Sequence, residues 1–133
     1  MPIPKTPELI AEGERIKGLI LDEAIAIHRE YGPFLLENFY EKALAGRLRK
    51  HGLTVLEQVA ISVEDHGNKI DLAFRLDLLV NNLVVVELKV AAQDNVAFHK
   101  QLITYLRLAK KPFGVLLNFG LPRLIDGYDQ YAN

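Results

Sequence analysis

The apolar residues of the first fifty positions recur at the three- and four-residue steps of amphipathic helices. From Pro7 to about Glu30 they form one stripe, made of Ile16, Leu19, Ile20, Ala24 and Ile27. Gly32 and Pro33 then interrupt the pattern. A second helix is predicted from roughly Leu35 to His51, on a stripe made of Tyr40, Ala43, Leu44 and Leu48.

After Gly52 apolar and polar residues alternate, as they do in strands with one buried face. The segment 54–65 is predicted to be a strand, and the HGN sequence at 66–68 indicates a hairpin turn. The next strand extends to Val80, with one apolar face made of Ile70, Leu72, Phe74, Leu76, Leu78 and Val80. Asparagines at 81 and 82 mark another turn, and VVVELKV at 84–90 is predicted to be the third strand.

The C-terminal part of the chain is predicted to add a helix and one more strand. Asp94 is a candidate cap for a helix that extends to about Lys110, with a stripe of Phe98, Leu102, Tyr105, Leu106 and Ala109. FGVLLNF at 113–119 has the composition of a buried strand. A strand, a helix and a strand in succession favour a crossover with parallel strands. The predicted fold class is α/β (α+β), in the order α-α-β-β-β-α-β, with a mixed sheet flanked by helices.

Glu87 and Lys89 are charged residues in an otherwise apolar strand, and they share one face because side chains alternate. A two-residue loop before this strand would mix apolar and charged residues on both faces. A three-residue loop at 81–83, with Asn82 left-handed, keeps each face uniform. In that register Asp77 lies opposite Glu87. The other predicted pairs are Arg75 with Lys89, Leu78 with Val86, Leu76 with Leu88 and Phe74 with Val90.

Two carboxylates that face each other across a strand pair repel, so a cation is expected between them. Lys89, Arg75 or a divalent metal ion could supply the positive charge. Mg²⁺ binds one or two carboxylates and keeps its other positions for water and phosphate. Such an ion can activate water and neutralise charge on a phosphodiester.

The composition restricts the chemistry further. The chain has 133 residues, a size typical of one domain, taken here as 1–133. The absence of cysteine excludes disulfides, zinc–thiolate sites and a cysteine nucleophile. Because no apolar run approaches the ~20 residues of a membrane span and the N-terminus has no apolar signal core, we expect a cytoplasmic protein without membrane contact. The net charge of −1 means that nucleic-acid binding would need a local basic patch.

The charged residues of the third strand also resemble a known nuclease pattern. Asp77, nine intervening residues and then the sequence Glu87–Lys89 resemble the acid and acid-x-lysine motif of the PD-(D/E)xK nuclease superfamily. QLITY follows, with Gln101 and Tyr105 one helical turn apart, and resembles the Q-x-x-x-Y element of the RecB-like branch.

An upstream segment extends this resemblance. GPFLLENFYEKAL at 32–44 is similar to the signature of the GxxExxY protein family of the same superfamily, although Phe34 replaces the glycine of the motif. The resemblance implies a restriction-endonuclease-like core. It also implies a nuclease that depends on Mg²⁺ or Mn²⁺ and hydrolyses DNA phosphodiesters with a metal-activated water.

The same resemblance implies a role for individual residues. Its metal ligands would be the side chains of Glu37, Asp77 and Glu87 with the backbone carbonyl of Leu88. Its catalytic set would be Asp77, Glu87, Lys89, Gln101 and Tyr105. Lys89 would orient the attacking water or stabilise charge at phosphorus. Gln101 and Tyr105 would brace the site or touch the nucleic-acid backbone.

Ordinary interpretations remain open for these residues. Glu87 and Lys89 can line the solvated face of an edge strand, and Glu37 can be an acid that the helix macrodipole favours in a first turn. Gln101 and Tyr105 can lie at the edge of the core. The alternative function is a catalytically silent nuclease-like scaffold that binds nucleic acid or protein. A homodimer or a protein partner would help so short a chain to hold a duplex.

The basic run of Arg47, Arg49 and Lys50 is expected to be a solvated helix end. The alternative is a phosphate-contacting patch formed together with Lys100, Arg107, Lys110 and Lys111.

Overall fold

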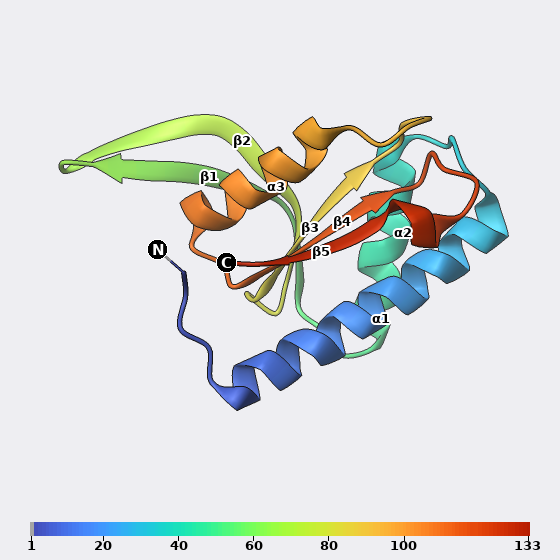
Figure 1. Ribbon diagram of the computed structural model, residues 1–133, viewed down its shortest axis with the longest axis horizontal. Coiled ribbons are helices and arrows are strands. Elements are labelled where there is room, and N and C mark those ends of the chain that lie inside the picture. Colours follow the sequence, from blue (N-terminus) through green and yellow to red (C-terminus); the bar gives the residue numbers. More distant parts are fainter. Residues whose placement is uncertain (1) are drawn as a thin grey trace.

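The computed structural model of the chain describes residues 2–133, without the side chain of Ala73. Its elements in chain order are α1 Pro7–Tyr31, α2 Glu37–Lys50, β1 Val55–Asp65, β2 Asn68–Val80, β3 Val84–Lys89, α3 Val96–Ala109, β4 Phe113–Asn118, the 3₁₀ turn η1 Leu124–Gly127 and β5 Tyr128–Ala132. The strands form one mixed sheet in the order β1-β2-β3-β4-β5. Helices α1 and α2 cover one face of this sheet, and α3 covers the other (Figure 1).

The two N-terminal helices lie where their apolar stripes predict them. Thr6 caps α1 by accepting a hydrogen bond from the Leu9 amide at 3.1 Å. The helix ends at Gly32, whose φ of 74° suits a glycine. Helix α2 begins at Glu37, slightly later than predicted, because the backbone of Leu36 is extended. None of the helices in the described part of the chain is long and apolar enough to cross a membrane.

The predicted stripes supply a core on each face of the sheet. The core under α1 and α2 includes Ile16, Ile20, Ala24, Ile27, Tyr40, Leu44, Leu48, Leu78, Val84, Val86 and Leu88. The core under α3 consists of Ile61, Leu76, Leu79, Val85, Leu102, Tyr105, Leu106 and Leu116. Strands β3 and β4 therefore pack on both faces, which explains their nearly continuous apolar sequence.

The crossover through α3 leaves β3 and β4 parallel, as predicted. The cap of α3 is Asn95 rather than Asp94, since the Asn95 side chain accepts a hydrogen bond from the Ala97 amide at 2.9 Å. Asp94 instead lies 2.8 Å from the His99 ring. The sequence did not predict η1 or β5. Strand β5, with the sequence YDQYA, is short and has no clear apolar alternation, and it forms by pairing antiparallel to β4 at the sheet edge.

The three-residue loop between β2 and β3 is confirmed, and with it the first part of the predicted register. Leu78 pairs with Val86, Leu79 with Val85, and Val80 with Val84. Asn82 is left-handed with a φ of 57°, and its neighbour Asn81 is too, with a φ of 49°.

The register prediction is wrong beyond Leu78, because β2 and β3 pair no further. The expected pairs of Arg75 with Lys89, Leu76 with Leu88, and Phe74 with Val90 do not form. Beyond this point β2 follows β1 alone, and the two strands project from the sheet as an antiparallel arm (Figure 1).

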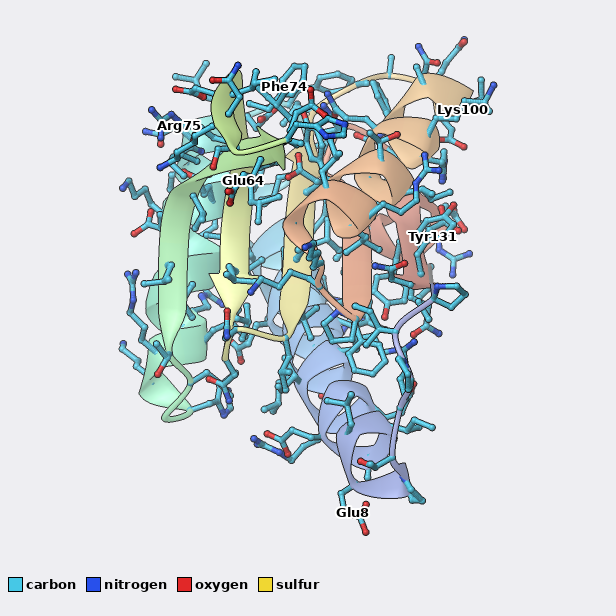
Figure 2. All side chains as sticks on the ribbon, turned by 90° about the vertical axis from the view of Figure 1, so that its left-hand side faces the viewer. Glu8, Glu64, Phe74, Arg75, Lys100 and Tyr131 are labelled. Atoms are coloured by element: carbon cyan, nitrogen blue, oxygen red, sulfur yellow. The ribbon has the colours of Figure 1, made fainter. Side chains whose placement is uncertain are left out.

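The uniform apolar face predicted for β2 is also wrong. Leu76 packs in the core under α3, whereas Leu78 packs in the core under α1 and α2. Phe74 is 46% exposed and lies 5.6 Å, between ring centroids, from Tyr105 of α3. Its neighbour Arg75 lies on the other side of the arm (Figure 2). The strand thus changes its orientation around Asp77, where it leaves β3.

Candidate active site

Asp77 and Glu87 meet in the gap that opens between β2 and β3. The Asp77 amide donates to Glu87 Oε1 at 3.2 Å, and the Asp77 carboxylate accepts a hydrogen bond from the Leu88 amide at 2.9 Å. The Asp77 side chain thus occupies a place that a backbone carbonyl of β2 would fill in a regular ladder. The two carboxyl groups converge on one polar gap rather than emerging from opposite sides of the sheet.

A second irregularity in β1 accompanies this gap. Gln58 lies between the pairs formed by Glu57 with Leu78 and by Val59 with Leu76, and its φ is 53°. A left-handed conformation is uncommon for such a residue and indicates a constrained backbone. It lets the Gln58 amide reach both Glu41 Oε1, at 2.5 Å, and Asp77 Oδ1, at 3.4 Å.

Helix α2 supplies two more carboxylates to the same region. Glu37 is in its first turn, and Glu41 follows four residues later, so both side chains lie on one face of the helix. Glu41 is only 4% exposed. Sequence reasoning missed Glu41 and Gln58. The spacing of Glu41 from Glu37 was the available signal, whereas nothing in the sequence marked Gln58.

The carboxyl groups of this acid cluster, which we define as Glu37, Glu41, Asp77 and Glu87, all have raised pKa values. Burial raises the pKa of Glu87 to about 9, and the negative charge of Asp77 adds to the effect. Burial also raises the pKa of Asp77, although the hydrogen bond from the Leu88 amide opposes the shift. Burial and the charge of Asp77 raise the pKa of Glu37, and burial raises that of Glu41. The buried site therefore favours the protonated form of these carboxyl groups.

Lys89 acts electrostatically on three acids of this cluster, and its position is held from α3. The Lys89 ammonium donates to the Gln101 side-chain oxygen at 2.9 Å and lies 5.2 Å from the centre of the Phe98 ring. Its charge lowers the pKa of Asp77, Glu87 and Glu37 in part. Arg75, the other cation that the sequence suggested, donates instead to the Gln58 carbonyl at 3.4 Å.

Tyr105 lies beneath the acids on the face covered by α3. Its side chain belongs to that core and is 5% exposed. Burial raises the pKa of its hydroxyl, the charges of Glu87 and Asp77 raise it further, and a hydrogen bond with Gln101 opposes them. The phenol therefore stays protonated at neutral pH and can act as a hydrogen-bond donor.

The segment that resembles the GxxExxY signature forms the turn leading to the cluster. Tyr40 is fully buried and its ring stacks on Phe119 with the centroids 4.1 Å apart. Its hydroxyl donates to the Gly32 carbonyl at 2.5 Å and accepts from the Leu35 amide at 3.0 Å. Phe34 has a φ of 67°, a conformation that favours glycine. The backbone of this turn thus explains why the motif has glycine at that position.

The donor set suits a hard divalent cation. Two carboxylates from Asp77 and Glu87 meet beside the backbone of Leu88, and Mg²⁺ commonly binds through one or two carboxylates while keeping several waters. The N–H and C=O of one strand residue project toward the same neighbour, so we expect the Leu88 carbonyl to face the same gap. Within residues 2–133, no three His, Asp or Glu side chains form a group that could hold a metal ion, so the structure does not bring Glu37 to Asp77 and Glu87 as a third carboxylate ligand.

The basic run of α2 is occupied elsewhere. Arg47 contacts Glu30 at 2.7 Å, and Arg49 contacts Glu57 at 3.2 Å and the Val55 carbonyl at 2.7 Å. This pairing favours the helix-end interpretation over the phosphate patch for both arginines.

Comparisons with known proteins agree with this geometry. The family model described as the PD-(D/E)XK nuclease superfamily matches residues 14–129. The crystal structure of SSO0001 is similar, with a TM-score of 0.53 and 22% sequence identity over 94% of this chain, which spans 60% of that protein. The comparison with curated proteins gave no match. The family match and the shared restriction-endonuclease-like fold lead to one conclusion: the chain belongs to the PD-(D/E)XK nuclease superfamily.

Proposed function

We propose that the protein is a nuclease that hydrolyses DNA phosphodiesters at the acid cluster with the help of Mg²⁺ or Mn²⁺. Membership of the nuclease superfamily supports this proposal. Its finer assignment, to the GxxExxY family and the RecB-like branch, stays a prediction based on the motifs at 32–44 and 101–105.

The observation that carries the proposal is the convergence of Asp77 and Glu87 in a break of the sheet. Glu87 is 4% exposed and its pKa is raised to about 9, so the site holds its second negative charge only at a cost. A divalent cation removes that cost by binding both carboxylates in their ionised form. Perturbed carboxyl groups gathered at one place are typical of functional sites.

The residues around the acids have distinct tasks in this proposal. Asp77 and Glu87, with the Leu88 carbonyl, would hold the cation, and Glu37 would complete the site from α2. A bound cation would supply an activated water and neutralise charge at the phosphodiester. Lys89 orients the attacking water or stabilises the developing charge at phosphorus. Gln101 holds the Lys89 ammonium in place at 2.9 Å, and Tyr105 braces Gln101 from below.

The test compares cleavage by the wild type with cleavage by Glu87→Gln and Lys89→Met. Labelled single-stranded, duplex and branched DNA are incubated with each protein in Mg²⁺, Mn²⁺ or EDTA. We expect metal-dependent cleavage that each substitution lowers by about 100-fold or more, the range seen when one electrostatic stabiliser is removed. Glu8→Gln, at the far end of α1 (Figure 2), is the matched control and should cleave like the wild type. Equal cleavage by all four proteins would point to a contaminating nuclease and refute the proposal.

A catalytically silent scaffold that binds nucleic acid or protein is the alternative. Phe34 in the place of the motif glycine and the near-neutral net charge favour it. Binding to DNA or to a protein partner, without cleavage of any of the three substrates in either metal, would support it. A homodimer or a protein partner is compatible with both functions.

A further inference from the structure

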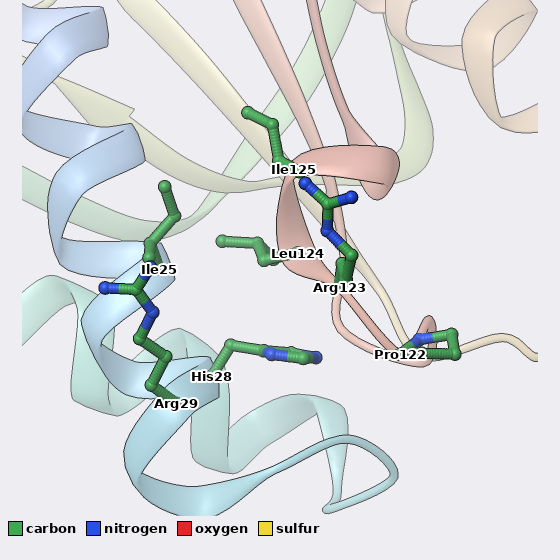
Figure 3. Close-up of a pocket in the computed structure, with 7 residues that line it drawn as sticks. All are labelled: Ile25, His28, Arg29, Pro122, Arg123, Leu124 and Ile125. Carbon is green, nitrogen blue, oxygen red and sulfur yellow. The ribbon is translucent and has the colours of Figure 1, made fainter.

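A second site lies away from the acid cluster, between α1 and the segment that follows β4. It is a cavity of about 190 Å³, which we call the arginine pocket, lined by Ile25, His28, Arg29, Pro122, Arg123, Leu124 and Ile125. Figure 3 shows that α1 contributes one of its two arginines and the loop before η1 contributes the other. Between them lie apolar side chains such as Leu124.

The two arginines of this pocket have no counter-charge of their own. Within the described residues 2–133, no carboxylate or other acceptor contacts the guanidinium of Arg29 or Arg123, and no acidic residue lines the pocket. Arg47 and Arg49, by contrast, each contact a glutamate. An unpartnered pair of guanidinium groups around a cavity favours an anionic ligand.

The walls of the arginine pocket are rigidly connected. His28 is 7% exposed, and its Nε2 lies 2.9 Å from the Leu121 carbonyl, so this nitrogen donates its hydrogen and ties α1 to the loop that carries Arg123. Just before that loop, the Phe119 amide donates to the Lys89 carbonyl at 2.8 Å. These contacts fix the backbone on both sides of the pocket, while the side chains of Arg29 and Arg123 are exposed.

The arginine pocket and the acid cluster lie at the same end of the sheet. Phe119 connects them, because its ring stacks on Tyr40 and lies 6.2 Å, between centroids, from the His28 ring. Tyr40 is on α2, one turn after Glu37. The arginine pocket follows the carboxyl end of β4, and Glu87 lies near the carboxyl end of the parallel strand β3, at the edge where α/β sheets commonly bind ligands.

We propose that the arginine pocket binds one phosphate group of the nucleic-acid strand that is cleaved at the acid cluster. This inference rests on the proposed nuclease function. The planar forks of Arg29 and Arg123 match phosphate oxygens, with which arginine can form paired hydrogen bonds. The volume of about 190 Å³ is below the ~300 Å³ at which pockets for whole small molecules begin, so the pocket suits a phosphate group rather than a complete nucleotide.

The first test uses inorganic phosphate and needs no catalysis. Phosphate is titrated into ¹⁵N-labelled protein, and the arginine Nε–H signals are followed by NMR. We expect the signals of Arg29 and Arg123 to shift together in a saturable way, while that of Arg107, at the opposite end of β4, shifts little. Equal and unsaturable shifts at all three arginines would overturn the proposal. Because cleavage is not measured, this result does not depend on whether the protein is a nuclease.

The second test decides whether the phosphate belongs to a nucleic-acid strand. Binding of fluorescent oligonucleotides, with and without a 5′-phosphate, is measured by anisotropy in EDTA over a range of salt concentrations. The double variant Arg29→Gln/Arg123→Gln should bind about 10- to 100-fold more weakly at low salt. The slope of its log affinity against log salt concentration should become shallower by about 1 for each phosphate that the variant no longer neutralises. Arg29→Lys/Arg123→Lys keeps the charge without the fork and should recover only part of the affinity.

Arg15→Gln/Lys69→Gln also removes two exposed positive charges, away from the pocket, and serves as the matched control. A loss of affinity in this control as large as that in Arg29→Gln/Arg123→Gln would indicate diffuse attraction and refute the site. Saturable phosphate binding with unchanged oligonucleotide affinity would assign the pocket to free phosphate and refute its role in strand binding. If the affinity depends on the 5′-phosphate, the bound group is the end of the strand. If the affinity is the same without the 5′-phosphate, the bound group is an internal phosphodiester.

Discussion

The substitution Glu87→Gln should stabilise the protein at neutral pH in the absence of metal, although it removes an acidic residue from the proposed active site. Burial raises the pKa of Glu87 from 4.5 to about 9, so the folded protein keeps this carboxyl protonated at pH 7 while the unfolded chain ionises it. Ionisation of the unfolded chain draws the equilibrium toward unfolding. Glutamine has a similar shape and can still accept from the Asp77 amide, but it does not ionise.

The magnitude follows from the two pKa values of Glu87. The contribution of the protonated Glu87 carboxyl to the stability of the folded protein is fully present below about pH 4.5. It is lost as the pH rises toward about 9, where Glu87 ionises in the folded state as well. Each pH unit in this window lowers the stability by about 1.4 kcal/mol relative to the variant. At pH 7 the difference in the free energy of unfolding is therefore on the order of 3 kcal/mol in favour of glutamine.

The assay is urea unfolding followed by circular dichroism, in EDTA, at one-unit steps from pH 5 to pH 8. The advantage of Glu87→Gln should grow with pH. Glu57→Gln is a control of opposite sign, because Glu57 accepts hydrogen bonds from Lys42 and Arg49 that lower its pKa. Loss of the Glu57 carboxylate should reduce the free energy of unfolding at neutral pH. If Glu87→Gln were less stable than the wild type at pH 8, or its advantage did not change with pH, the argument for a buried and uncompensated carboxyl would be wrong.

Three further predictions concern the same region. Mn²⁺ at 100 times its Kd should stabilise the wild type by about 2.7 kcal/mol and so raise its melting temperature, whereas Asp77→Asn should lose this effect. An unchanged melting temperature of the wild type at millimolar Mn²⁺ would contradict the metal site. Phe34→Gly should stabilise the protein by about 1 kcal/mol, because the φ of 67° at this position favours glycine, whereas Phe34→Ala keeps the Cβ atom and should not. Urea unfolding distinguishes the two variants, and equal effects on stability would disprove the backbone explanation. Tyr40→Phe removes a hydroxyl that bonds Gly32 and Leu35, and it should lower the unfolding free energy by about 1–3 kcal/mol; an unchanged value would mean that water replaces these bonds.

The order of the elements and the first part of the hairpin register could be predicted because they depend on local periodicity. A strand repeats every two residues, so Glu87 and Lys89 had to share a face. The loop at 81–83 then followed, since a slip by one residue would have mixed charged and apolar residues on both faces of β2 and β3. The same argument brought Asp77 and Glu87 to neighbouring positions, and the structure brings their side chains together.

The prediction failed where interactions distant in sequence replace the regular pattern. The ladder between β2 and β3 ends after Leu78 because the Asp77 side chain takes the Leu88 amide, a choice that periodicity does not reveal. Strand β5 was missed since its five residues show no clear apolar alternation and form a strand by pairing with the edge of β4. The pairing of Lys89 with Gln101 likewise depends on where α3 crosses the sheet.

The amino-acid sequence by itself determined which segments become helices and strands, which of their faces are apolar, and which acids share a strand face, since these properties follow from side-chain spacing within a few residues. Only the tertiary structure decided where the sheet opens, how deeply Glu87 is buried, and that Glu41 and Gln58 lie beside Asp77. Desolvation and the repulsion between carboxylates depend on distances between separate elements, and those distances exist only once the chain has packed.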